Sequence, residues 1–302
     1  MHTLSQSLQT FLTTYQLKYI NFVHKNENKK TAVIVVEKSD YKYIIKSIDD
    51  TASESIREKF CNEVKFYQNN DLRFIPKYIH SNENVLQLEY IDGITFRNHL
   101  LKDMVTDSQI KSLFDETFEL YTTAKKDSNH VNYSKVHTHL AVLATSGPIQ
   151  TKDMFIPLSS KIMNWTILQV LKYKLHHVLK HIDIAKLRNG FSHGDLHYNN
   201  ILITNSGVIK LIDFENVNYN GVYDFDLIYL FVMVELYIMK DQFNSIKKEI
   251  ISKICEDEKA LINIIDIYRL SILLNKKFHI GCQVRASKLK LLYKALAFQA
   301  VK

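Results

Sequence analysis

The sequence predicts an α+β fold of two lobes: a small N-terminal lobe built on an antiparallel sheet with one crossing helix, and a larger, mainly helical C-terminal lobe. Three observations predict this fold. Residues 31–37 and 41–48 alternate like paired strands around a tight polar turn at 38–40. Residues 54–67 follow with helical periodicity. From 94 to 190 the periodicity is mostly helical, which places the larger lobe after the sheet.

Further segments complete each lobe. The clearest are a leading helix at 5–15, a strand at 85–91, and helices at 108–125 and 161–181. We expect the hinge near residues 89–93, where the strand ends in an Asp-Gly pair. The chain then divides into an N-terminal lobe at 1–91 and a C-terminal lobe at 92–302.

The composition is that of a globular protein large enough for two lobes, with 302 residues, 46% hydrophobic and 24% charged. Residues 1–18 lack a basic leader followed by a continuous apolar stretch, so we expect no signal peptide. The most apolar run, at 227–234, is far shorter than the roughly 20 residues that cross a bilayer. Cys61, Cys255 and Cys282 match neither a metal-ligand spacing nor an even disulfide set, and we expect a cytoplasmic protein.

The net charge of +7 fits either an anionic partner or a solvated, lysine-rich surface. We expect no nucleic-acid partner, because no recognisable binding motif accompanies the charge. Residues 286–301 form a predicted basic amphipathic helix, with lysines among leucines. Such a helix either packs on its own domain, which is the commoner outcome, or makes weak peripheral contact with an anionic surface, here that of the inner membrane.

The most informative stretch of the chain begins at His193. A His-Gly-Asp sequence ends at Asp195, Asn200 follows five positions later, and an apolar strand, a turn with one glycine and a second strand lead to Asp213. For a loop of two or three residues, Asn200 lies opposite Asp213 or Ile212, so an amide and a carboxylate meet at one end of the hairpin. Such a pair suits a hard cation that takes oxygen ligands.

Two charged residues lie in apolar surroundings in the small lobe. Lys46 shares one face of its strand with Ile44 and Ile48. Glu63 falls beside the apolar stripe of the helix at 54–67. Charged side chains rarely occupy such positions unpaired, so we expect Lys46 and Glu63 to form an ion pair across the interior of the lobe. The alternative is that each extends separately to water.

Together, these residues resemble the protein-kinase-like superfamily, specifically its aminoglycoside phosphotransferase and choline kinase branch. The resemblance is strongest over residues 193–227, and by the order of elements it covers nearly the whole chain. It implies that Asp195 is the catalytic base or orients the acceptor hydroxyl. It also implies that Asn200 and Asp213 hold Mg²⁺ on the phosphates of ATP.

The same resemblance implies roles for other residues. Lys46 would contact the ATP phosphates, and Glu63 would orient it. Glu89 and Ile91, in the strand that leads into the hinge, would offer backbone groups to adenine. His193 would be structural and would brace the catalytic loop.

Several departures distinguish the chain from protein kinases. Gly194 stands where an arginine usually precedes the catalytic aspartate, so control by an activation-loop phosphate is not expected. Only 12 residues separate Asp213 from Asp226, which best matches the family aspartate that fixes the catalytic loop, with Asp224 as its rival. This interval is too short for an activation loop and a peptide-docking segment, so we expect a non-peptide acceptor. The loop expected over the phosphates, at 24–30, contains no glycine, and we assign it no nucleotide contacts.

We therefore predict an ATP- and magnesium-dependent phosphotransferase that moves the γ-phosphoryl group to an alcohol of a small molecule or glycan. The basic chain favours an anionic acceptor, so a sugar hydroxyl is preferred, with a choline, amino-alcohol or aminoglycoside kinase as the alternative. A non-catalytic, kinase-like binding protein is the alternative of another class. Zinc binding through His177 and His181, or through His137 and His139, lacks a further ligand and is not expected. The sequence leaves the oligomeric state open.

Overall fold

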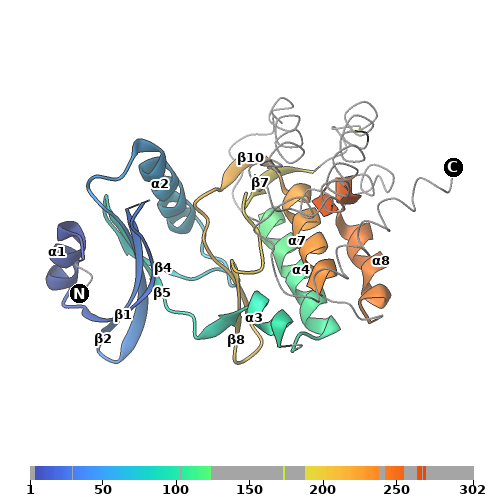
Figure 1. Ribbon diagram of the computed structural model, residues 1–302, viewed down its shortest axis with the longest axis horizontal. Helices are drawn as coiled ribbons and strands as arrows, with labels where there is room; N and C mark the ends of the chain where they lie inside the picture. Colours follow the sequence, from blue (N-terminus) through green and yellow to red (C-terminus); the bar gives the residue numbers. More distant parts are fainter. Residues whose placement is uncertain are drawn as a thin grey trace, which may run out of the picture.

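The computed structural model describes residues 4–28, 30–102, 104–123, 173, 188–237, 242–254, 264–266 and 268–269. Within these ranges the protein has the two lobes and the α+β class that the sequence predicts, a sheet with flanking helices followed by a mainly helical body (Figure 1). Most of the predicted helix at 161–181, the basic helix at 286–301 and the four histidines considered as zinc ligands lie outside the described residues.

The small lobe is a five-stranded antiparallel sheet in the order β1-β2-β3-β5-β4. Its elements are α1 (Gln6–Thr14), β1 (Lys18–Asn26), β2 (Thr31–Lys38), β3 (Tyr41–Ile48), α2 (Glu54–Asn69), β4 (Tyr78–Ser81) and β5 (Val85–Glu89). β2 and β3 pair without any shift in register. Between them, Ser39 and Asp40 have φ of 49° and 67°, the left-handed values that a two-residue type I′ turn requires at both positions.

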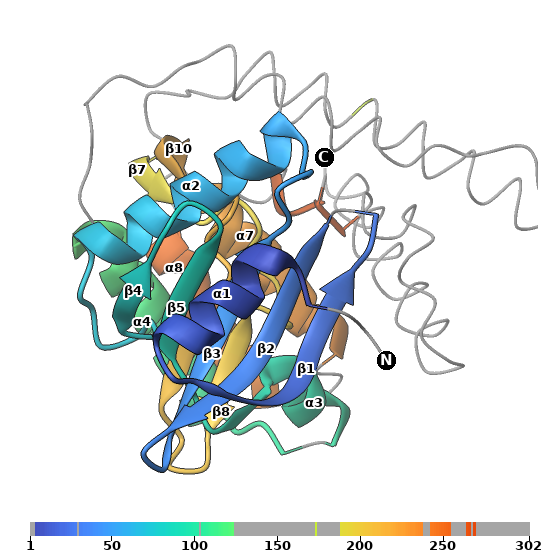
Figure 2. The ribbon, with the colours of Figure 1, turned by 90° about the vertical axis from the view of Figure 1, so that its left-hand side faces the viewer.

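Helices cover both faces of this sheet. α1 lies across the face that is turned away from α2 (Figures 1 and 2). Under α1 lies a separate small core of Leu8, Phe11, Leu12, Leu17, Ile34, Val36, Ile45 and Val85. The opposite face carries Lys46, between Ile44 and Ile48, and its apolar residues belong to a larger core that continues into the second lobe. The two sides of β3 therefore face different environments, as strand alternation requires.

The large lobe combines two small sheets with helices. Its described elements are β6 (Gly93–Thr95), α3 (Phe96–Leu101), α4 (Asp107–Thr123), β7 (Asn189–Ser192), β8 (Ile201–Thr204), β9 (Ile209–Leu211), β10 (Asn218–Val222), α7 (Tyr223–Tyr237) and α8 (Gln242–Ile254). β6, β8 and β9 form one sheet, and β7 pairs with β10. Figure 1 shows these strands between the five-stranded sheet and helices α4, α7 and α8. The β8–β9 hairpin thus occupies the junction of the lobes.

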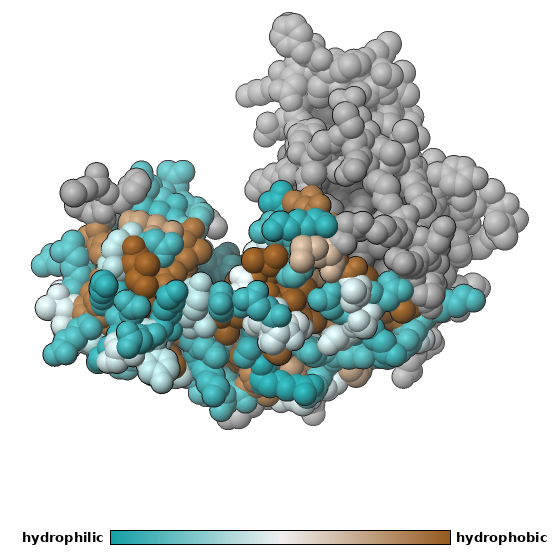
Figure 3. Space-filling model, turned by 90° about the horizontal axis from the view of Figure 1, so that it is seen from below, coloured by the Kyte–Doolittle hydropathy of each residue, from teal (hydrophilic) through white to brown (hydrophobic). Residues whose placement is uncertain are grey.

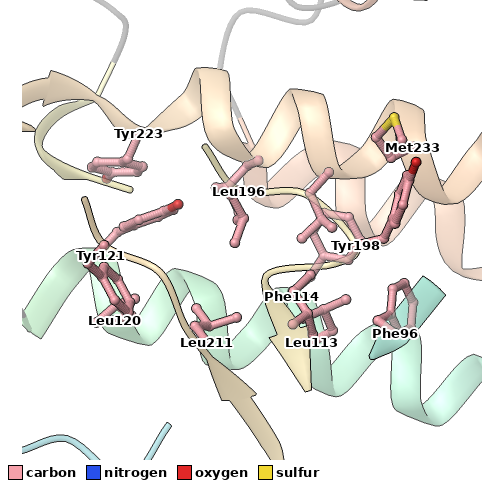
Figure 4. Close-up of a cluster of buried hydrophobic side chains, with 14 of the residues drawn as sticks. Phe96, Leu113, Phe114, Leu120, Tyr121, Leu196, Tyr198, Leu211, Tyr223 and Met233 are labelled. Atoms are coloured by element: carbon pink, nitrogen blue, oxygen red, sulfur yellow. The ribbon is translucent and has the colours of Figure 1, made fainter. Parts of the chain in front are cut away.

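α7 is the central helix of the larger core. Every residue from Leu227 to Val234 except Tyr229 is buried. In Figure 4, side chains of α4 and α7 meet around Leu196 and Tyr198 of the intervening loop. A helix with apolar residues on all sides is typical of such a central position. Among the described residues, no helix is long and apolar enough to cross a membrane.

Two hydrogen bonds tie the β8–β9 hairpin to the connection between α2 and β4. The Leu211 N–H donates to the carbonyl oxygen of Phe74 (2.7 Å), and Nζ of Lys210 donates to that of Ile75 (3.1 Å). Phe74 and Ile75 are both buried. This connection therefore packs directly on the hairpin, although β4, which follows it, belongs to the five-stranded sheet.

The predicted strands at β2 and β3 and the predicted helix at α2 are present. β5 ends at Glu89, two residues before the end of the predicted strand at 85–91. β1 was not predicted, because it is a largely exposed edge strand with two register shifts and lacks a clean alternation of apolar residues. We propose the lobe boundary between residues 91 and 92, after β5 and before β6, which pairs with β8.

The substitution Asp40→Gly is expected to stabilise the protein. A residue with a Cβ in the left-handed region costs about 1–2 kcal/mol, somewhat less for aspartate, and glycine avoids most of this cost. After the larger entropy of the unfolded glycine chain is subtracted, we expect a gain of about 0.5 kcal/mol, measured as a higher urea midpoint at an unchanged m-value. Asp71→Gly is the control, because Asp71 is exposed and has no positive φ. An unchanged midpoint for Asp40→Gly would contradict the type I′ geometry.

Candidate active site

The β8–β9 hairpin brings an amide and a carboxylate to one end. Its three-residue loop, at 205–207, ends at Gly207, whose φ of 82° is the left-handed conformation that such loops need at their last position. With this loop length Asn200 lies opposite Ile212, whose N–H donates to the Asn200 carbonyl oxygen (3.0 Å). Asp213 is the next residue, so both side chains belong to the end of the hairpin that faces the small lobe.

Lys46 of β3 connects the small lobe to this hairpin. Its Nζ donates to Oε2 of Glu63 (2.6 Å) and to Oδ1 of Asp213 (2.7 Å). The first contact is the ion pair predicted from the sequence. The Glu63 side chain is 1% exposed and that of Asp213 is 35% exposed. Three charges therefore form a chain from α2, through β3, to the second residue after β9.

Burial and mutual attraction shift the pKa values of these three groups. Burial alone would lower the pKa of Lys46, but the two carboxylates outweigh it, and the pKa is raised. Burial raises the pKa of Glu63 to about 7, against the attraction of Lys46. Burial also acts to raise the pKa of Asp213, but Lys46 outweighs it and the pKa is lowered. The two carboxylates share one ammonium group, and the pKa is raised at the fully buried Glu63 and lowered at the more exposed Asp213.

Asp213 has an unusual backbone conformation that its neighbours hold in place. Its φ of 69° lies in the left-handed region, which is costly for a residue with a Cβ and is often found at functional sites. The ring of Phe214 stacks on Phe66 of α2 with 3.9 Å between centroids and meets Tyr67 edge-on at 5.6 Å. On its other side Phe214 contacts His193, at 4.4 Å. This packing fixes the turn that directs the Asp213 carboxylate toward the ammonium group.

Asp226 of α7 fixes the His-Gly-Asp loop through the backbone of that loop, as predicted. Its Oδ2 accepts the N–H groups of His193 (2.6 Å) and Gly194 (3.2 Å). Gly194 has φ of 77°, and an added Cβ would lie 2.3 Å from the carbonyl oxygen of Asn216. Only glycine fits this position without displacing the backbone.

Asp224, the rival candidate for this place, has a different partner. The guanidinium group of Arg188 donates to its Oδ1 from Nε (2.9 Å) and Nη2 (2.7 Å), and the Arg188 N–H donates to Oδ2 (2.8 Å). The guanidinium group also lies over the rings of Phe118 and Tyr223. Asp224 therefore anchors the start of α7 to the residue before β7.

His193 is fully buried, and its Nε2 lies 3.0 Å from the carbonyl oxygen of Ile212. A carbonyl oxygen can only accept, so Nε2 carries the hydrogen. Burial lowers the pKa of His193 to about 4, and the ring is therefore neutral near pH 7. These contacts agree with the structural role expected of His193, since it links the loop to the hairpin.

Asp195 is the ionisable group of the loop that is open to a ligand, with its side chain 43% exposed. Its main-chain carbonyl oxygen accepts a hydrogen bond from Nδ2 of Asn200 (2.9 Å), which closes the loop. Burial raises the pKa of Asp195, His197 opposes this shift, and the carboxylate of Asp213 adds to it. An accessible carboxylate with a raised pKa suits a group that accepts a proton from a bound alcohol.

The two residues predicted to contact adenine lie at the end of β5. The Glu89 N–H donates to the carbonyl oxygen of Lys77 (2.9 Å), and Oε2 of Glu89 accepts the Lys77 N–H (3.1 Å). Ile91 follows in the connection to β6 and is partly exposed. Contact with adenine stays a prediction, and for Glu89 it is limited to the carbonyl oxygen. The glycine-free loop is the β1–β2 turn, where Lys30 takes a left-handed conformation (φ 55°).

The oxygen atoms of Asn200 and Asp213 fit Mg²⁺. Nδ2 of Asn200 is committed to the Asp195 carbonyl, which leaves the amide oxygen for an ion. Oδ1 of Asp213 accepts from Lys46, which leaves Oδ2. Among the described residues, no group of three His, Cys, Asp or Glu side chains is placed to hold a metal ion. A magnesium ion here would therefore complete its coordination with phosphate oxygens and water, as it commonly does in phosphate-transfer sites.

Three residues near Asp195 were not predicted from the sequence. Glu215 follows the Asp-Phe pair and lies 3.7 Å from Nζ of Lys59 on α2. Tyr229 projects from α7, and its pKa is raised by burial and by the carboxylate of Asp195. Tyr198 is also close, since it contributes to the raised pKa of Tyr229. The position of Glu215 beside the Asp-Phe pair was an available signal, whereas Tyr229 lies in a helix without apolar periodicity.

Comparison with known proteins places this geometry in context. A family model described as choline/ethanolamine kinase matches residues 73–259. No curated protein sequence matches the chain.

Several solved structures share the fold. The choline kinase LicA from Streptococcus pneumoniae is 12% identical, with a TM-score of 0.55 over 97% of this chain and 98% of that chain. The aminoglycoside phosphotransferase APH(2")-IIa, solved as a streptomycin-ATP ternary complex, is 14% identical, with a TM-score of 0.56 over 97% of both chains. A Plasmodium vivax ethanolamine kinase is 15% identical, with a TM-score of 0.52 over 93% of this chain and 81% of that chain.

Two glycine substitutions separate backbone strain from steric exclusion at this site. Gly194→Ala adds a Cβ in the left-handed region and against a backbone carbonyl, so we expect a loss of at least about 2 kcal/mol of stability and of most activity. Gly207→Ala adds the same strain in open space, so it should cost only about 1 kcal/mol and leave activity intact. Urea denaturation measures both effects. Equal costs for the two variants would refute the tight packing at Gly194.

Proposed function

The chain belongs to the choline/ethanolamine kinase family and is a phosphotransferase with an alcohol group as acceptor; on this premise we propose that it transfers the γ-phosphoryl group of ATP to a small amino alcohol, with Mg²⁺ bound by Asn200 and Asp213. The observation that carries the proposal is the contact between Nζ of Lys46 and Oδ1 of Asp213 (2.7 Å). It supports the proposal because it joins Lys46, the lysine proposed to bind the phosphates, to the proposed magnesium ligand Asp213, where the two lobes meet. Figure 3 shows that the surface is hollowed between the lobes.

In the proposed mechanism the chain aligns the reactants and neutralises charge, because phosphoryl transfer needs little covalent chemistry from the protein. The Lys46 ammonium group has three donors, of which Glu63 and Asp213 use two, so the third can meet a phosphate oxygen. Asp195 accepts the proton of the acceptor hydroxyl while the oxygen of that hydroxyl forms a bond to the γ-phosphorus. The bond to the β-phosphate oxygen breaks, and ADP leaves. When bound, Mg²⁺ neutralises charge on the phosphates.

Local residues favour an amino alcohol over the sugar acceptor preferred from the net charge. The net charge sums the whole chain, whereas the ionisable groups that act on the pKa of Asp195 are two carboxylates, those of Asp213 and Glu215, and two basic side chains, those of His197 and Lys59. Tyr229 adds an aromatic ring near this group, since the charge of Asp195 acts on the pKa of Tyr229, and its ring centroid is 6.0 Å from that of Tyr268. Carboxylates and tyrosine rings both attract ammonium groups, and this combination supports an amino-alcohol acceptor.

The roles of the two aspartates are separable by substitution. Asp195→Asn should lower kcat at least about 100-fold while leaving Mg²⁺-ATP binding intact, because it removes only the proton acceptor. Asp213→Asn should lose both turnover and the thermal stabilisation by Mg²⁺-ATP. Coupled ADP-release assays and thermal shift measure the two effects, with Asp71→Asn in an exposed loop as the control. Turnover at the wild-type rate in Asp195→Asn would refute its assignment.

The acceptor class is tested with choline, ethanolamine, sugars and aminoglycosides. We expect an amino alcohol to have the highest kcat/KM. For that acceptor, Tyr229→Leu should raise KM about 10-fold by removing a cation–π contact, whereas Tyr229→Phe should retain most of the affinity. Tyr41→Leu, at a residue that is 71% exposed on β3, serves as the control. Preference for a sugar or an aminoglycoside would overturn the acceptor assignment while leaving the phosphotransferase activity intact.

A further inference from the structure

A tyrosine of α4 reaches the aspartate that fixes the catalytic loop. Tyr121 is fully buried, and its hydroxyl donates to Oδ2 of Asp226 (2.9 Å). We propose that Tyr121 is a positioning residue for phosphoryl transfer, because its hydrogen bond holds the Asp226 carboxylate in the orientation that places Asp195. The proposal rests on the function assigned to Asp195 above.

The geometry at Asp226 concentrates three donors on one oxygen. Oδ2 accepts the Tyr121 hydroxyl and the N–H groups of His193 (2.6 Å) and Gly194 (3.2 Å). The two N–H groups belong to consecutive residues, of which Gly194 is in the left-handed region (φ 77°), and Asp195 is the next residue. A small rotation of the carboxylate would lengthen at least one of these bonds. The direction of the Asp195 side chain therefore depends on a contact made from α4, in another part of the lobe.

Tyr121 is held so that its hydroxyl can point only in this direction. Its ring stacks on Tyr223 (5.4 Å between centroids) and lies against Phe191 (5.8 Å). Figure 4 shows Tyr121 extending from α4, beside Tyr223, toward the space below α7 where Leu196 of the loop lies. Because the ring is fixed by its neighbours, the hydroxyl needs little reorganisation to hold the carboxylate.

The electrostatics of Asp226 make this donor important. Burial raises the pKa of Asp226 to about 6, while Tyr121 and the N–H groups of Gly194 and His193 act to lower it and the carboxylate of Asp195 acts to raise it. Tyr268, from the segment at 264–269, also lies close enough to sense its charge. A protonated Asp226 is a weaker acceptor for the loop. Loss of the Tyr121 hydroxyl should therefore raise the pKa of Asp226 further. Asp226 would then stay protonated, and the loop less well held, up to a higher pH than in the wild type.

A role in packing alone is the competing explanation, and Tyr223 provides the matched control. Tyr223 is buried and stacks on Tyr121, but its ring lies against the guanidinium group of Arg188 (5.0 Å). Tyr223→Phe and Tyr121→Phe each remove one hydroxyl and keep the ring. A packing role predicts that the two variants behave alike, whereas a positioning role predicts that only Tyr121→Phe alters the catalytic loop.

The test compares these variants in the full-length chain. For Tyr121→Phe we expect kcat to fall at least about 10-fold, as for the loss of a hydrogen bond to a charged group, with KM for ATP unchanged. The acidic limb of the kcat profile should move to higher pH. Amide hydrogen exchange at residues 193 and 194 should become faster. Tyr223→Phe should show none of these changes.

A double-variant cycle shows whether Tyr121 acts through Asp226. Asp226→Asn should also accelerate exchange of the loop amides, and adding Tyr121→Phe should accelerate it no further. Additive effects of the two substitutions on loop exchange would overturn the proposal. It would also be overturned if Tyr121→Phe matched Tyr223→Phe in kcat, pH profile and loop exchange. If Tyr121→Phe does not fold, slow loop exchange in Asp226→Asn would also overturn it. If the wild type phosphorylates no alcohol, the proposed function fails, whereas hydrogen exchange still tests the contact.

Discussion

The structure depends on one shared cation, the Lys46 ammonium group between the carboxylates of Glu63 and Asp213. Each partner comes from a different part of the chain: α2, β3 and the second residue after β9. Removing the shared lysine from such a set leaves two carboxylates without a counter-charge, which is far more costly than losing an exposed pair. The relative placement of α2, the five-stranded sheet and the hairpin is therefore specified by charge as well as by packing.

The aromatic packing beside this charge chain serves the same placement. Phe66 and Tyr67 of α2 pack against the ring of Phe214, and Phe214 contacts His193 of the loop. Apolar contacts alone would tolerate small sliding movements of α2, whereas the ion pair fixes its register. Together they make the left-handed backbone at Asp213 sustainable, because the surrounding contacts offset the cost of a conformation that the residue alone would avoid. A similar logic holds in the large lobe, where Arg269 donates to both oxygens of Glu235.

The sequence predicts local features of this arrangement better than long-range ones. The hairpin and the pair of Lys46 and Glu63 follow from alternation and helical spacing, whereas the loop-fixing role of Asp226 follows from the resemblance to a known family. The edge strand β1 was missed because solvent faces most of its side chains, and periodicity reports only burial. Tyr121 and Tyr229 carry no signal of their own, because a buried tyrosine looks like any other core residue until its neighbours are known. The sugar acceptor preferred from the net charge stays a prediction, and a net charge does not report the charges around one loop.

The hydrogen bonds from the β8–β9 hairpin to Phe74 and Ile75 have a mechanical consequence. The connection after α2 is attached to the large lobe at one side and to the sheet at the other. If the lobes rotate about residues 90–92 during turnover, this attachment forms a second point of support. The motion would then be a rotation about the line that joins residues 90–92 to the contacts at Phe74 and Ile75. Because α2 would rotate with the small lobe, opening the nucleotide site would also move Glu63 away from Asp213.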